Sequence, residues 1–212
     1  MNTFSHTLLF GTVFLLTLKE LTEACSCFPT HPQQQFCNAD VVIRGKVISK
    51  EFINAKNVDR QVRYGIKMIK MFKGFHKIKD IDSVYTSAES SMCGIELDVV
   101  KKMEYLLTGH LWENKVTISL CGLSIPWKDV SAFQMESLSS TYQMGCNCKI
   151  TYCYVESCDT RAPNECLWKD WVYEHTLGGQ EAQNYACIQR KDGSCIWYPR
   201  LPVKQPIYGS HP

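Results

Sequence analysis

The stretch Val62-Arg63-Tyr64-Gly65-Ile66-Lys67-Met68 places an apolar side chain at every second position. This alternation is typical of a strand with one face in a core and the other toward solvent. Residues 41–49, which precede it, are rich in β-branched side chains and predict a second strand. The polar residues 51–60 between the two stretches predict a hairpin loop.

Further strands are expected downstream of this hairpin, at residues 83–86, 95–99, 105–109 and 116–120. Several short strands at such spacing favour a small barrel. One helix is expected after them, beginning at Asp129 or Ser131 and ending at Gly145, and it should pack on the barrel. Residues 25–37 have neither a helical nor a strand period, so an extended segment held by crosslinks is expected there.

The start of the chain predicts export from the cell. Residues 8–18 form an apolar run of signal-peptide length, and Thr22-Glu23-Ala24 resembles a cleavage site. Residues 1–24 are therefore predicted to be a signal peptide, which leaves Cys25 as the first residue of a secreted, extracellular protein. A transmembrane segment is disfavoured because about 20 apolar residues are needed to cross a bilayer. A bacterial lipoprotein site ahead of Cys25 is the other alternative, but Glu23 fits it poorly.

The cysteines predict a disulfide framework. All 12 follow the cleavage site, and an even number in an oxidising compartment indicates six bridges with no free thiol. The length suits one large domain or two small ones of about 100 residues, and small domains need such crosslinks because their cores are marginal. We therefore expect an N-terminal domain at residues 25–147 and a loop-rich C-terminal domain at residues 148–212.

The charge is nearly balanced, with 23 Lys and Arg against 21 Asp and Glu, a formal net charge of +2. This excess is too small to predict binding to nucleic acid. One stretch is locally basic and could bind an extracellular-matrix polyanion; it contains Lys67, Lys70, Lys73, His76, Lys77 and Lys79. The alternative is that these side chains form the solvated face of a strand and a turn.

The chain carries no recognisable catalytic motif. It has no His-Glu-x-x-His metal motif, no Gly-x-Ser-x-Gly elbow and no Gly-rich phosphate loop, and its 6 histidines are scattered. The Cys-x-Cys pairs would suit zinc in a cytosolic protein, but in a secreted chain disulfides are favoured. We therefore expect a protein that is not an enzyme and has no cofactor of its own.

Cleavage after Ala24 would give Cys25 a free α-amino group. Such a group has a pKa of about 8, so a nearby zinc ion can bind its neutral form. Together with the carbonyl oxygen of the same residue, the amine can close a five-membered chelate ring on a metal. Bridges at Cys25 and Cys27 would hold this end rigid and lower the entropic cost of binding. The alternative is a fortuitous cleavage position beside two ordinary structural cysteines.

The whole chain after residue 24 resembles the tissue inhibitor of metalloproteinases family, and the run Tyr142-Gln143-Met144-Gly145-Cys146 is most similar to its type-two branch. The segments that carry the resemblance are Cys25-Ser26-Cys27, His31-Pro32-Gln33-Gln34, Phe36-Cys37-Asn38-Ala39-Asp40-Val41-Val42-Ile43-Arg44, Met71-Phe72-Lys73-Gly74-Phe75, Tyr105-Leu106-Leu107-Thr108-Gly109, Cys146-Asn147-Cys148, Asn164-Glu165-Cys166-Leu167-Trp168 and Gly193-Ser194-Cys195.

The resemblance implies a mainly β fold with a few helices: an N-terminal five-stranded OB-like barrel of the netrin-like type and a smaller disulfide-rich C-terminal domain. It also implies a secreted inhibitor that forms 1:1 complexes with matrix metalloproteinases and related zinc proteases, the zinc being supplied by the protease. The bridges it implies are Cys25–Cys93, Cys27–Cys121, Cys37–Cys146, Cys148–Cys195, Cys153–Cys158 and Cys166–Cys187.

By the same resemblance, the amine and carbonyl group of Cys25 bind the protease zinc and Ser26 enters the S1′ pocket. Cys27 and Phe28 continue along the primed side of the cleft. The remaining predicted contacts are Asn38 and a second loop of Ser90, Ser91 and Met92.

Two departures from the type-two branch stand out. The hairpin at residues 51–60 is shorter, and the tail at residues 204–212 lacks the acidic residues with which that branch holds a progelatinase. A competing hypothesis is a netrin-like module that binds matrix or a receptor through the basic stretch and inhibits nothing.

Overall fold

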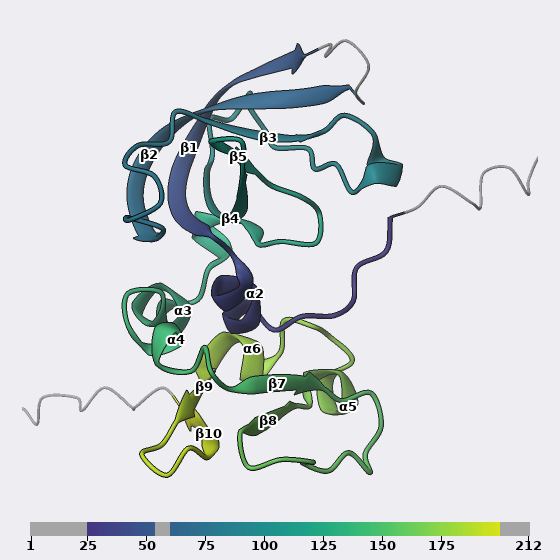
Figure 1. Cartoon of the computed structure of the whole chain (residues 1–212). Helices are drawn as coiled ribbons and strands as arrows, with labels where there is room; N and C mark the ends of the chain where they lie inside the picture. The colour runs from purple at the N-terminus through teal and green to yellow at the C-terminus, as the bar shows by residue number, and fades with distance from the viewer. Residues whose placement is uncertain (1–24, 54–59, 200–212) are drawn as a thin grey trace, which may run out of the picture. The chain divides into compact units, whose positions relative to one another are not determined.

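The computed structural model describes residues 25–53 and 60–199 (Figure 1). The predicted signal peptide, most of the predicted hairpin loop and the non-acidic tail lie outside these residues. The chain forms two compact units. The first contains the described residues up to Phe28 and those from Asp40 to Ser124, and the second contains Pro29–Ala39 and the described residues from Ile125 onward. The expected domain boundary between residues 147 and 148 stays a prediction.

The first unit is built on a ring of five strands (Figure 1). Their order is β1-β2-β3-β5-β4, and β1 also pairs with β4, which closes the ring. The pairs are antiparallel except for β3 with β5, which is parallel. The strands are β1 (Val41–Ile53), β2 (Gln61–Lys73), β3 (Ser83–Ser87), β4 (Glu104–Trp112) and β5 (Lys115–Thr117), and β6 (Ser124–Pro126) follows β4 in the sheet.

The alternating side chains that predicted the sheet do form its core. Val62, Tyr64 and Ile66 of β2 are buried, together with Val41, Ile43 and Val47 of β1. Burying these large apolar side chains contributes about 1.5–3 kcal/mol each. The fold class is therefore mainly β, as predicted, with a few short helices.

The strand expected at residues 95–99 is wrong, because this segment has no regular structure. Its amide groups bond to hydroxyl groups of the strands beside it and not to a neighbouring backbone. Ile95 donates to Thr86 Oγ1 at 3.1 Å, and Leu97 donates to the Tyr64 hydroxyl at 3.2 Å. Side chains thus satisfy the buried amides that a ladder would otherwise pair. The strand expected at residues 116–120 is real but ends at Thr117.

The segment expected to be extended between Cys25 and Cys37 contains helix α2 (Pro32–Asn38) in the second unit. Pro32 suits the first turn because its fixed φ is helical and it has no amide proton to leave unpaired. His31 caps the helix: its Nδ1 accepts a hydrogen bond from the Gln33 amide at 3.2 Å. A histidine ring in this role is outside the usual Ser, Thr, Asp and Asn pattern, so sequence rules missed the helix.

The helix expected between residues 129 and 145 is two short helices, α3 (Ala132–Ser137) and α4 (Thr141–Met144). Ser131 is the N-cap of α3, and with Gln134 it forms a capping box. Asp129 belongs instead to the short 3₁₀ helix η2 (Trp127–Asp129). Both α3 and α4 are part of the second unit, where α3 contacts α6 and α4 contacts β9.

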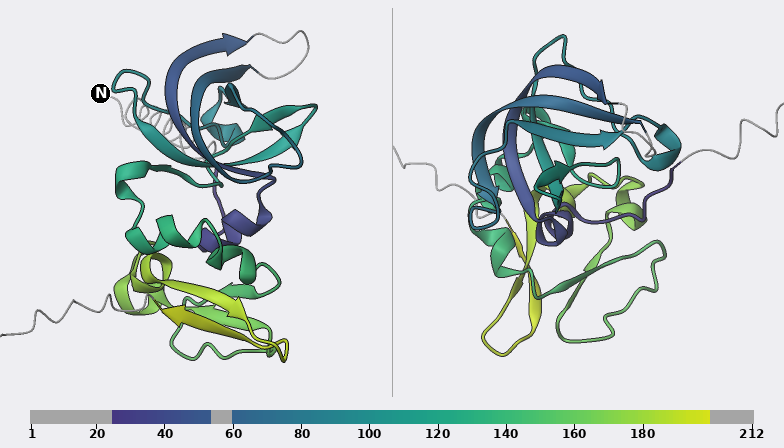
Figure 2. Two further views of the ribbon diagram at one scale, coloured as in Figure 1. Left: turned by 90° about the vertical axis from the view of Figure 1, so that its left-hand side faces the viewer. Right: turned by 45° about the horizontal axis from the view of Figure 1, so that its top comes forward.

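The second unit has more regular structure than the sequence predicts (Figure 2). Strands β7 (Lys149–Tyr152) and β8 (Glu165–Trp168) are parallel partners, and β9 (Tyr185–Gln189) and β10 (Cys195–Pro199) form an antiparallel hairpin. Helices α5 (Asp170–Glu174) and α6 (Gln180–Asn184) lie between β8 and β9 in the sequence. These elements are only four or five residues long, too short for a clear period.

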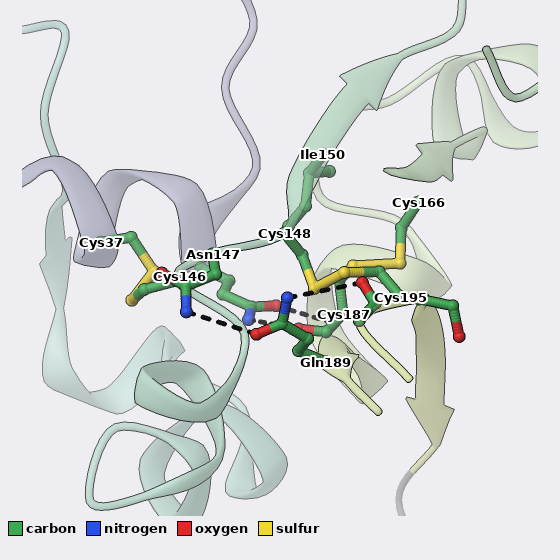
Figure 3. The surroundings of a disulfide bond; sticks show 12 residues. Cys37, Cys146, Asn147, Cys148, Ile150, Cys166, Cys187, Gln189 and Cys195 are labelled. Atoms are coloured by element: carbon green, nitrogen blue, oxygen red, sulfur yellow. Dashed lines mark hydrogen bonds between the residues drawn. A yellow bond between two sulfur atoms is a disulfide. The ribbon is translucent and has the colours of Figure 1, made fainter. Parts of the chain in front are cut away.

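Disulfide bridges supply much of the core of this unit (Figure 3). Cys148, Cys166, Cys187 and Cys195 are buried together, against Ile150 and Trp197. Four bridges lie in this unit: Cys37–Cys146, Cys148–Cys195, Cys153–Cys158 and Cys166–Cys187. Within the described residues no cysteine is free, and no helix is both long and apolar enough to cross a membrane.

Candidate functional site

Two disulfide bridges fix the beginning of the described chain. Cys25 is bonded to Cys93, with a Cα–Cα distance of 5.1 Å, and Cys27 is bonded to Cys121, with a Cα–Cα distance of 5.3 Å. With the four bridges of the second unit, these are the same six pairs that the family resemblance implies. Two anchors within three residues leave the intervening Ser26 little conformational freedom.

The two bridges also lie against each other. The sulfur of Cys121 is 4.0 Å from that of Cys25 and 3.8 Å from that of Cys93. These separations are close to van der Waals contact, so the four sulfur atoms form one cluster at the N-terminal segment. We refer to these atoms as the sulfur cluster.

The N-terminal segment presents its side chains to solvent. Ser26 and Cys27 are exposed, and 80% of the Phe28 surface is accessible.

The second predicted loop lies beside this segment through the Cys25–Cys93 bridge. Ser90, Ser91 and Met92 form the short 3₁₀ helix η1 (Ser90–Met92), and all three are exposed, Met92 by 57%. Cys93 follows in the left-handed conformation, with φ of 57°, and its amide donates to the Ser90 carbonyl oxygen. The structure thus brings seven of the predicted site residues together in one unit. We call residues 25–28 and 90–92 the N-terminal ridge.

Backbone hydrogen bonds make the loop of the N-terminal ridge rigid. The amides of Met92 and Gly94 both donate to the Glu89 carbonyl oxygen at 3.1 Å, and the Leu120 amide donates to the Cys93 carbonyl oxygen at 2.9 Å. The Glu89 carboxylate accepts from Arg60 at 2.8 Å, which ties the loop to the start of β2. The loop therefore holds its shape without a partner, which lowers the entropic cost of binding one.

The ridge has no ionisable side chain other than its cysteines, which are bridged. It consists of serine hydroxyls, backbone carbonyls, the bridges and two exposed apolar side chains, Phe28 and Met92. The side chains of this surface carry no charge, so burying them in a cleft costs less than burying ionised side chains would.

The eighth predicted residue, Asn38, lies in the other unit. It is the last residue of α2, it is exposed, and its Oδ1 accepts a hydrogen bond from Gln34 at 3.3 Å. Its surroundings belong to the second unit, so the structure describes it apart from the ridge.

Sequence reasoning missed three residues that support the ridge: Glu89, Gly94 and Leu120. Glu89 and Leu120 make the backbone hydrogen bonds described above, and Leu120 is also half exposed. Gly94 has no room for a side chain next to the backbone of Ser87 and Glu89. The sequence feature that could have identified them is their position next to bridged cysteines or predicted contact residues. Leu120 precedes Cys121, and Gly94 follows Cys93.

The basic residues lie on β2 and in the turn after it. Lys67 and Lys70 are exposed on β2, whereas Lys73 is partly buried and its pKa is lowered, mainly by burial and then by the charge of Lys77. Lys77 forms an ion pair with Asp40. That carboxylate also accepts from the Leu111 amide at 3.0 Å, and the two hydrogen bonds lower its pKa. The described part of the basic stretch is thus partly solvated and partly paired.

Comparison with known proteins identifies relatives over nearly all of the chain. Residues 23–197 match the family model described as "Tissue inhibitor of metalloproteinase". The chain is 47% identical over 202 residues to metalloproteinase inhibitor 2 of Homo sapiens, with 92% of this chain and 91% of the relative covered. It is 49% identical over 181 residues to metalloproteinase inhibitor 4 of Mus musculus, with 83% of this chain and 81% of the relative covered. These descriptions name inhibitors and not enzymes.

Proposed function

Because the chain belongs to the tissue inhibitor of metalloproteinase family, we propose that it is a secreted inhibitor of zinc metalloendopeptidases, chiefly matrix metalloproteinases, in 1:1 complexes. In this proposal residues 1–24 are removed as a signal peptide and the chain begins at Cys25. The zinc involved is that of the target protease.

The observation that carries the proposal is the double anchoring of the N-terminal ridge. Bridges at residues 25 and 27 hold the new chain end on a rigid loop and leave Ser26 exposed between them. The Cys25 sulfur is used in a bridge, so the groups left to bind a metal are the α-amino group and the carbonyl oxygen. These two atoms would close a five-membered chelate ring on the zinc.

This mode of binding would block catalysis directly. A catalytic zinc keeps one coordination position for the water molecule that attacks the substrate. A bidentate ligand in that position removes the nucleophile. Because the ridge is already ordered by its bridges and backbone bonds, little additional entropy is lost on binding.

The neighbouring residues have matching roles in the proposal. Ser26 enters the S1′ pocket, and Cys27 and Phe28 continue along the primed side of the cleft. Ser90, Ser91 and Met92 contact the protease beside them. Their exposure on one ridge supports a shared partner, and Asn38 is proposed as a further contact. We also propose that the five-stranded ring is an OB-like barrel of the netrin-like type, and that residues 25–147 carry the inhibition.

The test compares three forms of the oxidised chain that differ only at the first residue. These are residues 25–212 with a free amine, the same protein acetylated at that amine, and a protein that retains Ala24. Each is titrated against a matrix metalloproteinase of known active-site concentration. The free form should inhibit with an equivalence point of one inhibitor per protease, and the other two should lose nearly all inhibition. Equal inhibition by all three would refute the chelation mechanism.

A second candidate function, binding to an extracellular-matrix polyanion, is favoured by the pairing of β1 with β2. Lys46 lies opposite Lys67, and Arg44 lies opposite Lys70. Cross-strand pairs of like charge are normally unfavourable, and a sulfated polymer would relieve the repulsion. Glu104 reduces it in part, because its carboxylate accepts from Arg44 Nε at 2.8 Å. Lys67 and Lys70 are three positions apart on β2, and a register shift between Arg44 and Gly45 lets them pair with Lys46 and Arg44, which are two positions apart on β1.

This candidate is tested by the salt concentration that elutes the protein from a sulfated polysaccharide column. The double variant Lys67→Gln, Lys70→Gln should elute at clearly lower salt than the parent. The matched control is Lys101→Gln, Lys102→Gln, which removes the same charge from an exposed turn. Equal shifts for the two variants would show that only net charge matters and would refute a localised site.

A further inference from the structure

The sulfur cluster has a geometry that its role as a crosslink does not require. All four sulfur atoms, from Cys25, Cys27, Cys93 and Cys121, lie within 4.8 Å of one another. The Cys25-Ser26-Cys27 spacing brings together only one end of each bridge, and the structure adds that the other ends, Cys93 and Cys121, also meet at 3.8 Å between their sulfur atoms. The two bridges are in contact, so breaking them would leave four thiols facing a common centre.

We propose that, once both bridges are reduced, these four cysteines form a tetrahedral thiolate site for Zn²⁺ or a similar soft divalent cation. This site is separate from the inhibition proposed above, in which the amine and carbonyl group of Cys25 bind the zinc of a protease. It does not depend on that function.

The distances fit such a site. With Zn–S bonds of about 2.3 Å, the sulfur atoms of a tetrahedral Cys₄ site are about 3.8 Å apart. Two contacts between the bridges already have this spacing, at 3.8 Å from Cys93 to Cys121 and 4.0 Å from Cys25 to Cys121. The bonded sulfur pairs need only separate to the same distance, which small side-chain rotations can provide. An all-sulfur donor set selects zinc over magnesium or calcium.

Two of the four ligands would keep their positions without the bridges. The Leu120 amide donates to the Cys93 carbonyl oxygen at 2.9 Å, so the backbones that carry Cys93 and Cys121 stay side by side. The Cys93 amide is itself bonded to the Ser90 carbonyl oxygen at 3.1 Å. The other two ligands form a Cys-x-Cys pair on the N-terminal segment, which is free to adjust when the bridges open.

The same cluster is accessible to a reductant. Cys27 and Cys121 are exposed, whereas the comparable cluster of Cys148, Cys187 and Cys195 in the second unit is buried. Exposed bridges are generally the more labile ones. With a phosphine, each bridge and one water molecule give two thiols and a phosphine oxide. Binding of one Zn²⁺ then releases four protons as the thiolates coordinate.

The experiment uses the oxidised chain of residues 25–212. It is reduced stepwise with a phosphine under argon, freed of reductant, and titrated with Co²⁺ as a spectroscopic substitute for zinc. We expect the visible absorption of a tetrahedral cobalt thiolate, saturating at one ion per chain and abolished by Zn²⁺. Alkylation followed by peptide mapping should show that Zn²⁺ protects residues 25, 27, 93 and 121.

Two variants separate this site from unspecific thiol binding. Cys27→Ser, Cys121→Ser should lose the cobalt absorption, and the matched control Cys153→Ser, Cys158→Ser, which removes the same number of thiols elsewhere, should keep it. Protection mapped on the parent chain decides the question if a variant misfolds. No absorption, protection of residues 148, 166, 187 and 195 instead, or loss of absorption only in the control would each overturn the proposal.

Discussion

Gly94 lies so close to Ser87 that a methyl group on its α-carbon would overlap the Ser87 carbonyl oxygen. The same methyl group would also lie 2.8 Å from the carbonyl oxygen of Glu89. Both oxygens belong to backbone, which cannot rotate away as a side chain can. The absence of a side chain at residue 94 therefore allows the loop of the N-terminal ridge to close beneath Cys93.

Gly94→Ala should accordingly destabilise the first unit by about 1–3 kcal/mol, the usual cost of an overpacked site. Urea unfolding at neutral pH measures the change. The control is Gly178→Ala, because only the Thr176 hydroxyl lies near the added methyl group there, at 4.0 Å. If the two variants have equal stability, the close approach at Gly94 has no energetic consequence.

The buried His31 makes the second unit sensitive to acid. Burial lowers its pKa from 6.5 to about 4, and its ring packs edge-on against Trp168 with centroids 5.3 Å apart. In the unfolded chain the ring binds a proton near its ordinary pKa, so the unfolded state carries more protons between pH 4 and 6.5. Stability contributed by the neutral ring is complete above this window and is lost as the pH falls through it, by up to about 3 kcal/mol.

This prediction is checked by the pH dependence of unfolding, followed by tryptophan fluorescence. Asp170 acts on the same ring through its charge and Glu181 through its backbone carbonyl oxygen, and the pKa of the Glu181 carboxyl group is raised, mainly by burial. Glu181 therefore adds a slope of opposite sign, which is common to parent and variant. His31→Gln should flatten the rise in stability from pH 4 to 6.5, and the exposed control His76→Gln should retain it. An unchanged slope in His31→Gln would exclude His31 as the titrating group.

The sequence was informative where a residue's role depends on its near neighbours. Alternation along β2 identified the core residues Val62, Tyr64 and Ile66, and Ser131 identified the start of α3. It failed where distant groups satisfy the backbone. The hydroxyl of Tyr64 pairs with the Leu97 amide from 33 residues away, and the Gln33 amide group pairs with Cys187 from 154 residues away.

The site followed the same rule. Cys25 was predicted from the cleavage position and the chemistry of a free amine, Ser26 and the loop at residues 90–92 were predicted from the family resemblance, and the two bridges bring them together. The Cys25-Ser26-Cys27 spacing places one end of each bridge near the other, but the contact between Cys93 and Cys121 could not be predicted, because a list of disulfide pairs does not specify how far their far ends lie from each other. Gly94 and Leu120 were missed because their importance comes from backbone contacts that no local pattern records.

Gln33 should be a strong determinant of stability in the second unit. Its Nε2 donates to the Cys187 carbonyl oxygen at 2.7 Å and to the Tyr142 carbonyl oxygen at 3.3 Å, and its Oε1 accepts from the Cys187 amide at 2.7 Å. The side chain is fully buried. Gln33→Leu fits the space but leaves the Cys187 amide and carbonyl oxygen without these partners, whereas the Tyr142 carbonyl oxygen still accepts from the Gly145 amide at 3.2 Å. Each unpaired buried group costs about 1–3 kcal/mol.

We therefore expect Gln33→Leu to lower the free energy of unfolding by about 2–4 kcal/mol. Gln143→Leu, at an exposed position of α4, provides the matched control and should change it by less than about 0.5 kcal/mol. Thermal unfolding under non-reducing conditions gives both values. A Gln33→Leu protein as stable as the control would mean that other groups replace the lost hydrogen bonds.

Ser26 should determine which proteases are inhibited, if the proposed function is correct. It is exposed between two bridged cysteines, so a substitution there should alter the surface offered to a protease and leave the core unchanged. In the proposed complex its side chain enters the S1′ pocket, so a side chain that does not fit the pocket would weaken binding directly. Ser26→Arg should weaken inhibition by at least about tenfold for proteases with a shallow pocket and by less for those with a deep one.

An inhibition panel against metalloproteinases with shallow and deep S1′ pockets measures this effect, with unfolding curves to show that the fold is intact. The control for the added charge is Ser139→Arg, which introduces the same positive charge at another exposed serine. Ser26→Gly should also redistribute the inhibition constants across the panel, because the pocket loses its contact with the hydroxymethyl group. Uniform constants for all variants would place Ser26 outside the pocket while leaving chelation by Cys25 untouched, since the acetylation experiment tests that step separately.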